Sequence, residues 1–540
     1  MPALFDKVVQ QIALRKYELL LLLVVVLSAC MRYGLVGVPL ERDEGEYAYA
    51  GQLILQGIPP YEELYTMKLP GTNLVYAGIM ALCGQTHEGI HVGLIAFNIL
   101  IIITMYYLTK QVVDSLAGII AAASFAILSM GQSIQGIYAN TEHFVIFFAL
   151  TGIILLLYAL ERQKAWLVFL SGLLLGSGIL MKQHGMAFIA FALLYLFTHE
   201  FLAPYRKGWR NGLFLVAVLS IGAILPYLIT CLVFIYLGLF DKFWFWTVTY
   251  ALTYTSTIPM DLAWEGFKES AKGIFTAAPL IWVLAFIGLA SLAWDERARN
   301  RSLFIGGFAL FSFLSILPGF YFRPHYFILI LPAAALLSGL AVSSMAGKLP
   351  SGGSWIQRGI IPGLIVIIGI LISVFQQKQF LFEMTPTQIS RATYGLNPFP
   401  ESLEIARFIK DNTTENDRIA IIGSEPQIYF YSSRRAATGN IYMYPLMEKH
   451  DYALEMQKEM IREIEYTRPK YLVYVHIQTS WLAQRDSHKL IFNWLEQYLD
   501  RYYTIAGVVN ISMDKTEYLW SPDIQAPPDS PAWIAVFKKR

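Results

Sequence analysis

The chain has 540 residues, of which 56% are hydrophobic and only 15% are charged. Soluble domains carry about 25% charged residues, so this composition excludes an ordinary soluble protein and predicts a membrane protein. The net charge of +2 excludes a strongly basic protein, and we therefore expect no nucleic acid partner.

Apolar runs of roughly 18 or more residues predict a polytopic α-helical membrane protein with about 11–13 membrane helices and additional interfacial helices. The first span is predicted at about 19–38. Further spans are predicted at about 91–109, 115–131, 143–160, 166–181, 185–200, 212–240, 273–293, 302–320, 325–345 and 359–376. The three cysteines lie in apolar segments without metal-ligand spacing, so we expect small core residues there (Cys30, Cys83 and Cys231).

Basic residues predict the orientation of these spans. Lys7, Arg15 and Lys16 precede the first span, which predicts a cytoplasmic N-terminus and an extracytoplasmic first loop. Three later loops are basic and should be cytoplasmic as well (Arg206, Lys207 and Arg210; Arg297, Arg299 and Arg301; Lys348 and Arg358). These three loops lie on the same side of the membrane only if residues 74–83 do not cross it. We therefore expect a re-entrant or interfacial helix at 74–83.

The first outer loop carries a dense group of charges, which is costly at a membrane face without partners or a task. Asp43 and Glu44 are candidate catalytic carboxylates, since a carboxylate can deprotonate an acceptor hydroxyl or amine. The alternative is an ordinary acidic loop. Arg42 and Lys68 are candidate phosphate-binding cations, and the alternative for them is a snorkelling anchor. Residues 43–56 predict a short amphipathic helix lying along the membrane surface.

The same topology places four later polar segments outside, at 132–142, 182–184, 241–272 and 321–326. Glu142 is a candidate acidic contact for sugar or acceptor, or else a helix N-terminal charge. Lys182, Arg323 and His325 are candidate phosphate contacts, or else ordinary loop and interfacial residues. Segment 241–272 is predicted to be a loop whose aromatic residues form an interfacial belt.

The composition changes near residue 377, after which no long apolar run occurs. Short β-like runs at 418–422 and 471–477 alternate with helical stretches at 401–411 and 452–466, which predicts an α/β fold. We therefore expect a membrane domain at 1–376 and an extracytoplasmic α/β soluble domain at 377–540.

The first outer loop resembles that of GT-C glycosyltransferases, and the closest group is the protein mannosyltransferase-like and aminoarabinose-transferase-like enzymes. Four motifs carry this resemblance: Arg42-Asp43-Glu44 with Tyr47-Ala48, Gly57, Pro60-Tyr61, and Lys68-Leu69-Pro70. Supporting motifs extend it over about 1–375: Asn140-Thr141-Glu142, Leu180-Met181-Lys182 with Gly185, and His325-Tyr326-Phe327. Glu46 stands where aminoarabinose transferases carry an arginine.

The resemblance implies transfer of a sugar from a polyprenyl-phosphate donor, with inversion, to an extracytoplasmic lipid, glycan or protein acceptor. Asp43 would be the base or acceptor-orienting carboxylate, and Lys68 would bind the donor phosphate. Tyr47 and Tyr326 would join Glu142 in contacting sugar or acceptor. No cofactor is certain. A divalent metal ion stays open, with Asp43 and Glu44 as its ligands if there is one.

We expect such an enzyme in the inner or plasma membrane of a bacterium or archaeon, with its active site on the outer face. A transporter or flippase of a lipid-linked sugar is the main alternative. Transporters place ionisable groups near the bilayer midplane, often in paired repeats, whereas here these groups gather at one face and no repeat is seen. A non-catalytic membrane scaffold is the third interpretation, and it leaves the acidic loop unexplained.

Overall fold

The computed structural model describes residues 15–201, 209–255, 258–348, 355–521, 524 and 528–540. Lys7, Arg206, Lys207 and the side chain of Arg358, used above for the topology, lie outside the described part. The chain folds into two compact units. Unit 1 comprises Met1–Leu35, His91–Val233 and Ile258–Glu383, and unit 2 comprises Val36–Ile90, Phe234–Thr257 and Met384–Arg540.

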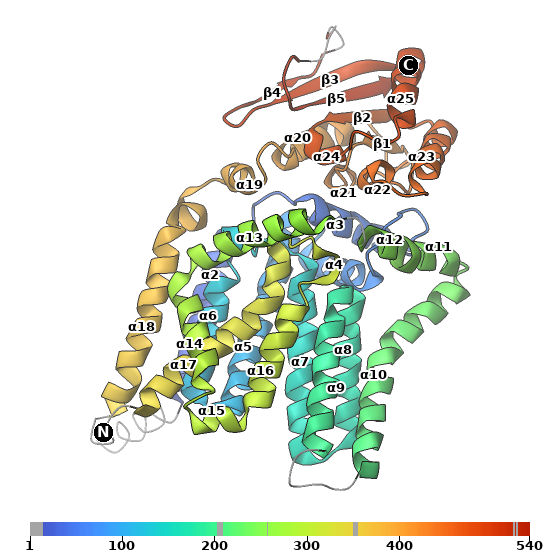
Figure 1. The fold of residues 1–540 in the computed structure, drawn as a ribbon. Helices are drawn as coiled ribbons and strands as arrows, with labels where there is room; N and C mark the ends of the chain where they lie inside the picture. The colour runs from blue at the N-terminus through green and yellow to red at the C-terminus, as the bar shows by residue number, and fades with distance from the viewer. Residues whose placement is uncertain (1–14, 202–208, 256–257, 349–354, 522–523, 525–527) are drawn as a thin grey trace, which may run out of the picture. The chain divides into compact units, whose positions relative to one another are not determined.

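Unit 1 is built of helices (Figure 1). Its helices are α2 Lys16–Tyr33, α5 His87–Val112, α6 Ser115–Leu128, α7 Thr141–Arg162, α8 Ala165–Met181, α9 Met186–Phe201, α10 Trp209–Tyr236, α13 Met260–Ala277, α14 Pro279–Ser291, α15 Glu296–Asn300, α16 Ser302–Leu314, α17 Leu331–Lys348 and α18 Trp355–Gln376. Short 3-10 turns include η1 Gln132–Ile134, η2 Gln183–Gly185 and η5 Pro324–Ile330. The fold is thus that of a polytopic helical membrane protein.

Five helical stretches of the described chain are long and apolar enough to cross a membrane, or six if one bent pair is a single span. They are His87–Val112, Thr141–Arg162, Gln183–Phe201, Trp209–Tyr236 and Pro324–Lys348. Four shorter apolar helices coincide with other predicted spans: Ser115–Leu128, Ala165–Met181, Ser302–Leu314 and Gly363–Gln376.

The bent pair corrects one predicted span and one predicted loop. Helices α13 and α14 meet at an angle of 102°, so the prediction of a single helix at 273–293 is wrong. Pro279 follows the bend, and a proline disfavours the helical conformation of the residue before it. Much of 241–272, expected as a loop, is helical: it includes α12 Ala251–Thr255 and most of α13.

The cysteines are free, but they are not core residues as expected. Cys30 and Cys83 are exposed and Cys231 is half-buried. Cys30 shares a face of α2 with the exposed Leu27 and Leu23, which precede Cys30 by about one and two helical turns. Apolar sequence therefore did not imply burial inside the protein, since a membrane helix also directs apolar side chains outward.

Unit 2 contains a five-stranded mixed sheet in the order β1-β2-β5-β3-β4 (Figure 1). Its strands are β1 Ile419–Ile422, β2 Tyr471–His476, β3 Tyr503–Ile511, β4 Thr516–Leu519 and β5 Trp533–Lys539. β1 and β2 are parallel, and the other neighbours are antiparallel. The strands at β1 and β2 and the helices near 401–411 and 452–466 agree with the α/β pattern predicted from the sequence.

Helices from three separate parts of the sequence complete unit 2, so packing does not follow a single boundary near residue 377. They are α3 Arg42–Leu55, α4 Pro70–Cys83, α11 Phe240–Trp244, α12, α19 Pro386–Tyr394, α20 Phe399–Asp411, α21 Gln427–Ser432, α22 Tyr444–Met447, α23 Ala453–Thr467, α24 Gln478–Trp481 and α25 Leu490–Tyr502. The first outer loop therefore folds together with the C-terminal part of the chain.

Helix α3 confirms the predicted helix at 43–56, but it does not lie as an open surface helix. Nearly all of its residues are buried, and it packs on both α4 and α21. The approach to α21 is close at Gly45, where an added Cβ would lie 2.6 Å from the backbone nitrogen of Gln427. Only glycine fits this crossing.

Candidate functional site

A capping box fixes the start of the helix that carries the predicted catalytic residues. The Glu41 side chain accepts a hydrogen bond from the backbone N–H of Glu44 (3.0 Å), and the Glu44 carboxylate accepts one from the backbone N–H of Glu41 (3.2 Å). Such reciprocal bonds satisfy two otherwise orphan donors at a helix start. Glu44 is fully buried, so the geometry favours a structural role for it.

Asp43 lies beside Glu44 in the sequence but faces a different set of groups. Its Oδ1 accepts hydrogen bonds from the Lys68 ammonium (2.8 Å) and from the Tyr442 hydroxyl (2.7 Å). The Asp43 side chain is 29% exposed. Because its carboxylate is held in place and still reaches solvent, Asp43 has the placement that a general base needs.

Lys68 joins two carboxylates. Besides Asp43, its ammonium contacts Glu46 Oε2 at 2.7 Å, and the Glu46 side chain is only 4% exposed. The Thr66 hydroxyl donates a hydrogen bond to the same carboxyl group. We call Asp43, Glu46, Thr66, Lys68 and Tyr442 the Asp43 cluster.

Charge and burial set the protonation of Lys68 in this cluster. Burial alone would lower its pKa, but the attraction of Asp43 and Glu46 outweighs burial and raises the pKa well above 10.5. The ammonium therefore stays charged at neutral pH. For Glu46 burial dominates and raises the pKa above 4.5, although Lys68 opposes this shift.

Tyr47 and Arg42 flank Asp43 on α3 and have distinct environments. The Lys68 ammonium lies 4.4 Å from the centre of the Tyr47 ring, a cation–π distance. Tyr47 itself is buried against Tyr76, with ring centres 5.4 Å apart. Tyr47 therefore supports the lysine directly, and its predicted contact with sugar or acceptor stays a prediction.

Arg42 is buried among groups from the C-terminal part of unit 2. Its guanidinium donates to Glu425 (2.6 Å), Asn397 Oδ1 (2.9 Å) and the Tyr444 hydroxyl (2.7 Å). It also donates to the backbone carbonyl of Ser424. This bonding favours an anchoring role for Arg42, and its predicted phosphate contact stays a prediction.

We predict that Arg42→Ala destabilises unit 2 by about 3–5 kcal/mol, because removing one partner of a buried ion pair leaves the Glu425 charge uncompensated. Arg407→Ala is the matched control, since Arg407 pairs with Glu404 on the surface, where its side chain is 70% exposed. Such surface pairs contribute about 0–1 kcal/mol. Thermal unfolding in detergent measures both variants, and equal midpoints would contradict the anchoring role.

The sequence reasoning missed Tyr442, and nothing in the local sequence could have found it. Tyr442 lies 399 positions from Asp43 in the chain, in a segment to which the sequence assigned no role. Its hydroxyl and the Lys68 ammonium bond the same oxygen of Asp43, which fixes the orientation of the carboxylate. Tyr442 is therefore a candidate positioning residue.

We predict that Tyr442→Phe lowers kcat for sugar transfer by about tenfold to a hundredfold, the cost of one hydrogen bond to a charged group. The KM for the donor should change little, because Lys68 keeps its place between the two carboxylates. Tyr431→Phe is a suitable control, since the Tyr431 hydroxyl accepts a bond from the backbone N–H of Leu40 at 2.9 Å. Equal kcat values for Tyr442→Phe and wild type would remove the positioning role.

The other five predicted site residues lie in unit 1, and three of them form a compact group. The Lys182 ammonium lies 2.5 Å from Glu142 Oε1 and 3.8 Å from the centre of the Tyr326 ring. Glu142 is fully buried at the start of α7 and also accepts a bond from the Thr141 hydroxyl at 3.1 Å. Glu142, predicted to contact sugar or acceptor, thus forms an ion pair with Lys182, predicted to contact phosphate.

His325 and Arg323 lie on and just before η5. His325 is buried, and its Nδ1 lies 3.1 Å from the side-chain oxygen of Gln135. Arg323 stacks its guanidinium 5.6 Å from the centre of the Tyr321 ring. Their predicted phosphate contacts stay predictions.

The residues named for a divalent metal do not form a matched pair of ligands. Asp43 directs Oδ1 to Lys68 and Tyr442, whereas Glu44 directs a carboxylate oxygen back to the start of its own helix. Among the described residues, no three histidine, cysteine, aspartate or glutamate side chains are grouped as metal ligands. The structure thus offers no built metal site in the Asp43 cluster.

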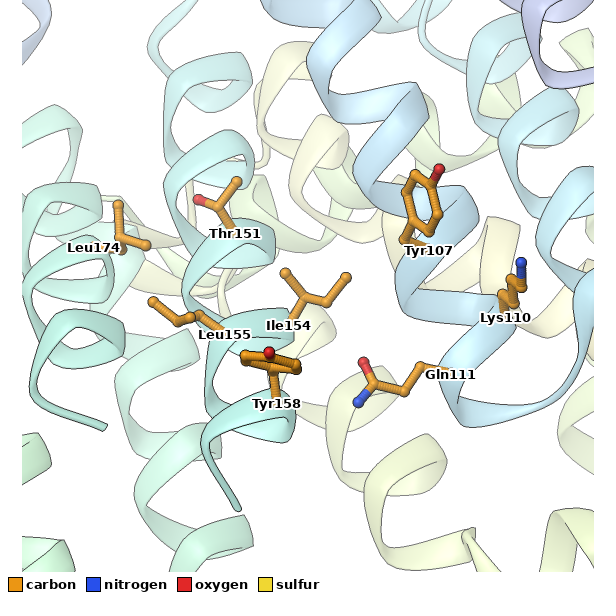
Figure 2. A pocket seen from close by; sticks show the side chains of 8 residues that line it. All are labelled: Tyr107, Lys110, Gln111, Thr151, Ile154, Leu155, Tyr158 and Leu174. Atoms are coloured by element: carbon orange, nitrogen blue, oxygen red, sulfur yellow. The ribbon is translucent and has the colours of Figure 1, made fainter. Parts of the chain in front are cut away.

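A separate cavity of about 740 Å³ opens in unit 1 between α5, α7 and α8 (Figure 2). Its lining is largely apolar, with polar groups contributed mainly by α5: Tyr107, Lys110, Gln111, Thr151, Ile154, Leu155, Tyr158 and Leu174. No carboxylate and none of the predicted site residues line it. It therefore suits a hydrocarbon chain rather than acid–base chemistry.

Comparison with known proteins gives one matching family model and several solved structures of similar fold. The family model described as dolichyl-phosphate-mannose-protein mannosyltransferase matches residues 68–230, a stretch that includes Lys68, Glu142 and Lys182 and begins after Asp43. No curated protein sequence matches the chain.

Solved structures share the fold at low sequence identity. ArnT from Cupriavidus metallidurans bound to undecaprenyl phosphate has a TM-score of 0.58 and 16% identity, covering 84% of this chain and 92% of ArnT. The Archaeoglobus fulgidus oligosaccharyltransferase AglB, in complex with an inhibitory peptide and a dolichol-phosphate, has a TM-score of 0.52 and 14% identity, covering 95% and 75%.

A second structure of the Archaeoglobus fulgidus oligosaccharyltransferase, a complex with Zn and sulfate, has a TM-score of 0.55 and 16% identity, covering 92% of this chain and 73% of that one. The fold thus recurs in membrane enzymes of two kinds. The family model thus matches one part of the chain, and the solved structures show that the whole chain is similar in fold to these enzymes.

Proposed function

We propose that this protein transfers one sugar from a polyprenyl-phosphate donor to an acceptor on the outer side of a membrane. The observation that carries the proposal is the Asp43 cluster, which joins a partly exposed carboxylate to a charged lysine. The structures of ArnT with undecaprenyl phosphate and of AglB with dolichol-phosphate support this donor class.

Lys68 is the proposed contact for the donor phosphate. An ammonium has three N–H donors, and two of these are used on Asp43 and Glu46. The third can meet a phosphate oxygen without breaking either ion pair. Neutralising the phosphate makes it a better leaving group, and this electrostatic contribution is realised as negative charge develops on the departing oxygen.

Asp43 is the proposed base. The acceptor hydroxyl or amine attacks the anomeric carbon, its proton passes to Asp43, and the bond from that carbon to the phosphate oxygen breaks. Polyprenyl phosphate leaves with the bonding electrons. A single displacement of this kind inverts the anomeric carbon and needs only one base.

The remaining site residues keep the roles proposed from the sequence. Lys182, Arg323 and His325 are weaker candidates for the phosphate, and Glu142 and Tyr326 are candidates for sugar or acceptor. We further propose about 11–13 membrane helices, a bacterial or archaeal inner or plasma membrane, and an extracytoplasmic position for the α/β part of unit 2.

The proposal is tested by incubating the purified protein with a panel of polyprenyl-phosphate sugars and a membrane extract that supplies acceptors. We expect release of polyprenyl phosphate from at least one donor, and no turnover of nucleotide sugars. Asp43→Asn protein serves as the control for non-enzymatic cleavage. Donor transport without cleavage, or cleavage that is equal in the Asp43→Asn variant, would contradict the proposed reaction.

A further inference from the structure

A polar groove of about 810 Å³ lies in unit 2, outside the Asp43 cluster. Its walls come from the segment before Lys68, from the ends of β1, β2 and β5, and from the end of α23. The side chains that matter for its chemistry are Glu63, Tyr65, Glu463, Tyr466, Arg468 and Lys539. None of these residues has a role in the proposed transfer.

The frame of the groove is held by polar contacts. Glu63 pairs with Arg418 at 2.9 Å and also with Arg435. Glu463 accepts hydrogen bonds from the Tyr65 hydroxyl (2.9 Å) and the Thr438 hydroxyl (2.6 Å). These contacts fix the walls before any ligand arrives, which lowers the entropic cost of binding.

Several side chains of the groove are not used by that frame: the Glu62 carboxylate, the ion pair of Asp417 with Lys470 at 2.9 Å, and three side chains that are central to the inference, Tyr466, Arg468 and Lys539. The Tyr466 side chain is 92% exposed, although an aromatic ring usually gains from burial. Arg468 and Lys539 are also exposed and form no ion pair with any described residue. An open aromatic face beside two available cations suits a ring-shaped ligand that carries negative charge.

The chemistry of the lining favours a saccharide over a peptide. Carboxylates, guanidinium groups and hydroxyls bond the hydroxyl groups of a sugar, and an aromatic ring covers its apolar face. A peptide strand would need an open sheet edge, but the outer edge of β1 is bridged by the segment at Ala436, through hydrogen bonds of Ile419 to Arg435 and Ala437.

The groove is connected to the Asp43 cluster by two chain segments that lie side by side. Tyr65 donates its backbone N–H to the carbonyl of Gly439 at 2.8 Å, and a Cβ on Gly439 would lie 2.6 Å from the Tyr65 ring. Three residues further on, these segments reach Lys68 and Tyr442. An extended residue spans at most about 3.6 Å, so the Cα atoms of Lys68 and Tyr442 lie within roughly 11 Å of those of Tyr65 and Gly439.

We propose that this groove binds an anionic saccharide, the part of the acceptor that leads to the hydroxyl attacked near Asp43. The proposal rests on the proposed function for the identity of the acceptor. Tyr466 stacks on a sugar ring, and Arg468 and Lys539 bind its carboxylate or phosphate substituents. Glu463 and Tyr65 line the same groove, where their polar groups lie within reach of sugar hydroxyls.

The test measures binding to the full-length protein in detergent by titration calorimetry. The probes are a hexuronic acid tetrasaccharide, a neutral hexose tetrasaccharide and a serine-rich tetrapeptide. We expect the acidic saccharide to bind most tightly. Tyr466→Ala should weaken that binding about tenfold, the loss expected for one stacking contact. The double variant Arg468→Ala/Lys539→Ala removes two charged contacts and should weaken it about a hundredfold.

Matched controls are Tyr502→Ala and Lys489→Ala, which remove an exposed tyrosine and an exposed lysine of unit 2 outside the groove. Both should bind as wild type does. No saccharide binding, tighter binding of the peptide or the neutral saccharide, or equal affinity in the groove variants would overturn the inference.

Binding is also measured with the Asp43→Asn variant, which should retain the groove. If the wild-type protein cleaves the donor but binds no saccharide, the proposed role of the groove is wrong and the proposed function stands. If the wild-type protein binds the acidic saccharide but cleaves no donor, the proposed function is wrong and the binding groove stands.

Discussion

Replacing Asp43 by asparagine should lower sugar transfer by about a hundredfold to ten-thousandfold, the range expected for loss of a general base. The variant should remain folded and inserted. The asparagine side-chain oxygen still accepts bonds from Lys68 and Tyr442, and Lys68 keeps Glu46 as its counter-charge. Release of polyprenyl phosphate under single-turnover conditions measures the effect on the chemical step.

The matched control for that experiment is Asp486→Asn. Asp486 also pairs with a lysine, Lys449 at 3.1 Å, but both side chains are more than half exposed. A change there alters net charge by the same amount without touching the Asp43 cluster. Wild-type turnover in Asp43→Asn, with a donor that the wild-type protein cleaves, would remove Asp43 from the chemistry.

Replacing Lys68 should have the second large effect, which is weaker binding of the donor. This effect must be separated from a loss of folded protein. Lys68→Met leaves the Glu46 carboxylate buried without its counter-charge, which costs about 3–5 kcal/mol of stability. The double variant Lys68→Met/Glu46→Gln removes both charges of that pair. It should recover most of the unfolding temperature, because the Thr66 hydroxyl can still donate to the glutamine oxygen.

The double variant should nevertheless bind the donor poorly. One charge-assisted contact to phosphate is worth about 1.5–3 kcal/mol, so KM for the donor should rise roughly tenfold to a hundredfold. Glu46→Gln alone is the control, since it keeps the ammonium and its contact to Asp43. If the double variant is stable and its KM equals that of the control, Lys68 does not bind the donor phosphate.

The structure gives Glu46 a specific set of partners. From the sequence, Glu46 is only the residue that stands where the aminoarabinose transferases, which the first outer loop resembles, carry an arginine. In the structure it is the buried partner of Lys68, held by Thr66. Asp43, Glu46 and Lys68 together carry a net charge of −1 when both carboxylates are ionised. An arginine in place of Glu46 would make the net charge of these three positions +1.

Local patterns determined much of the fold. Hydrophobic runs predicted most helices of unit 1, because a helix that crosses a bilayer must be apolar over its length. The α/β pattern after residue 377 and the helix at 43–56 also follow from local periodicity. Asp43 and Lys68 could be proposed as a pair because they flank one loop of modest length.

The tertiary structure decided the partners of these residues. Tyr442 reaches Asp43, and Glu425 reaches Arg42, across 399 and 383 positions of sequence. No local pattern encodes such contacts, since they depend on how α3 packs against the C-terminal part of unit 2. The burial of α3 was missed for the same reason, whereas the bend between α13 and α14 has a local cause in Pro279.

The sequence by itself thus determined that this is a membrane protein, where most of its helices lie, and which loop carries its candidate chemistry. Only the tertiary structure separated Asp43, which keeps access to solvent, from Glu44, which caps its own helix. The physical reason is that neighbouring residues on a helix point in different directions. Their partners, and therefore their roles, come from different parts of the fold.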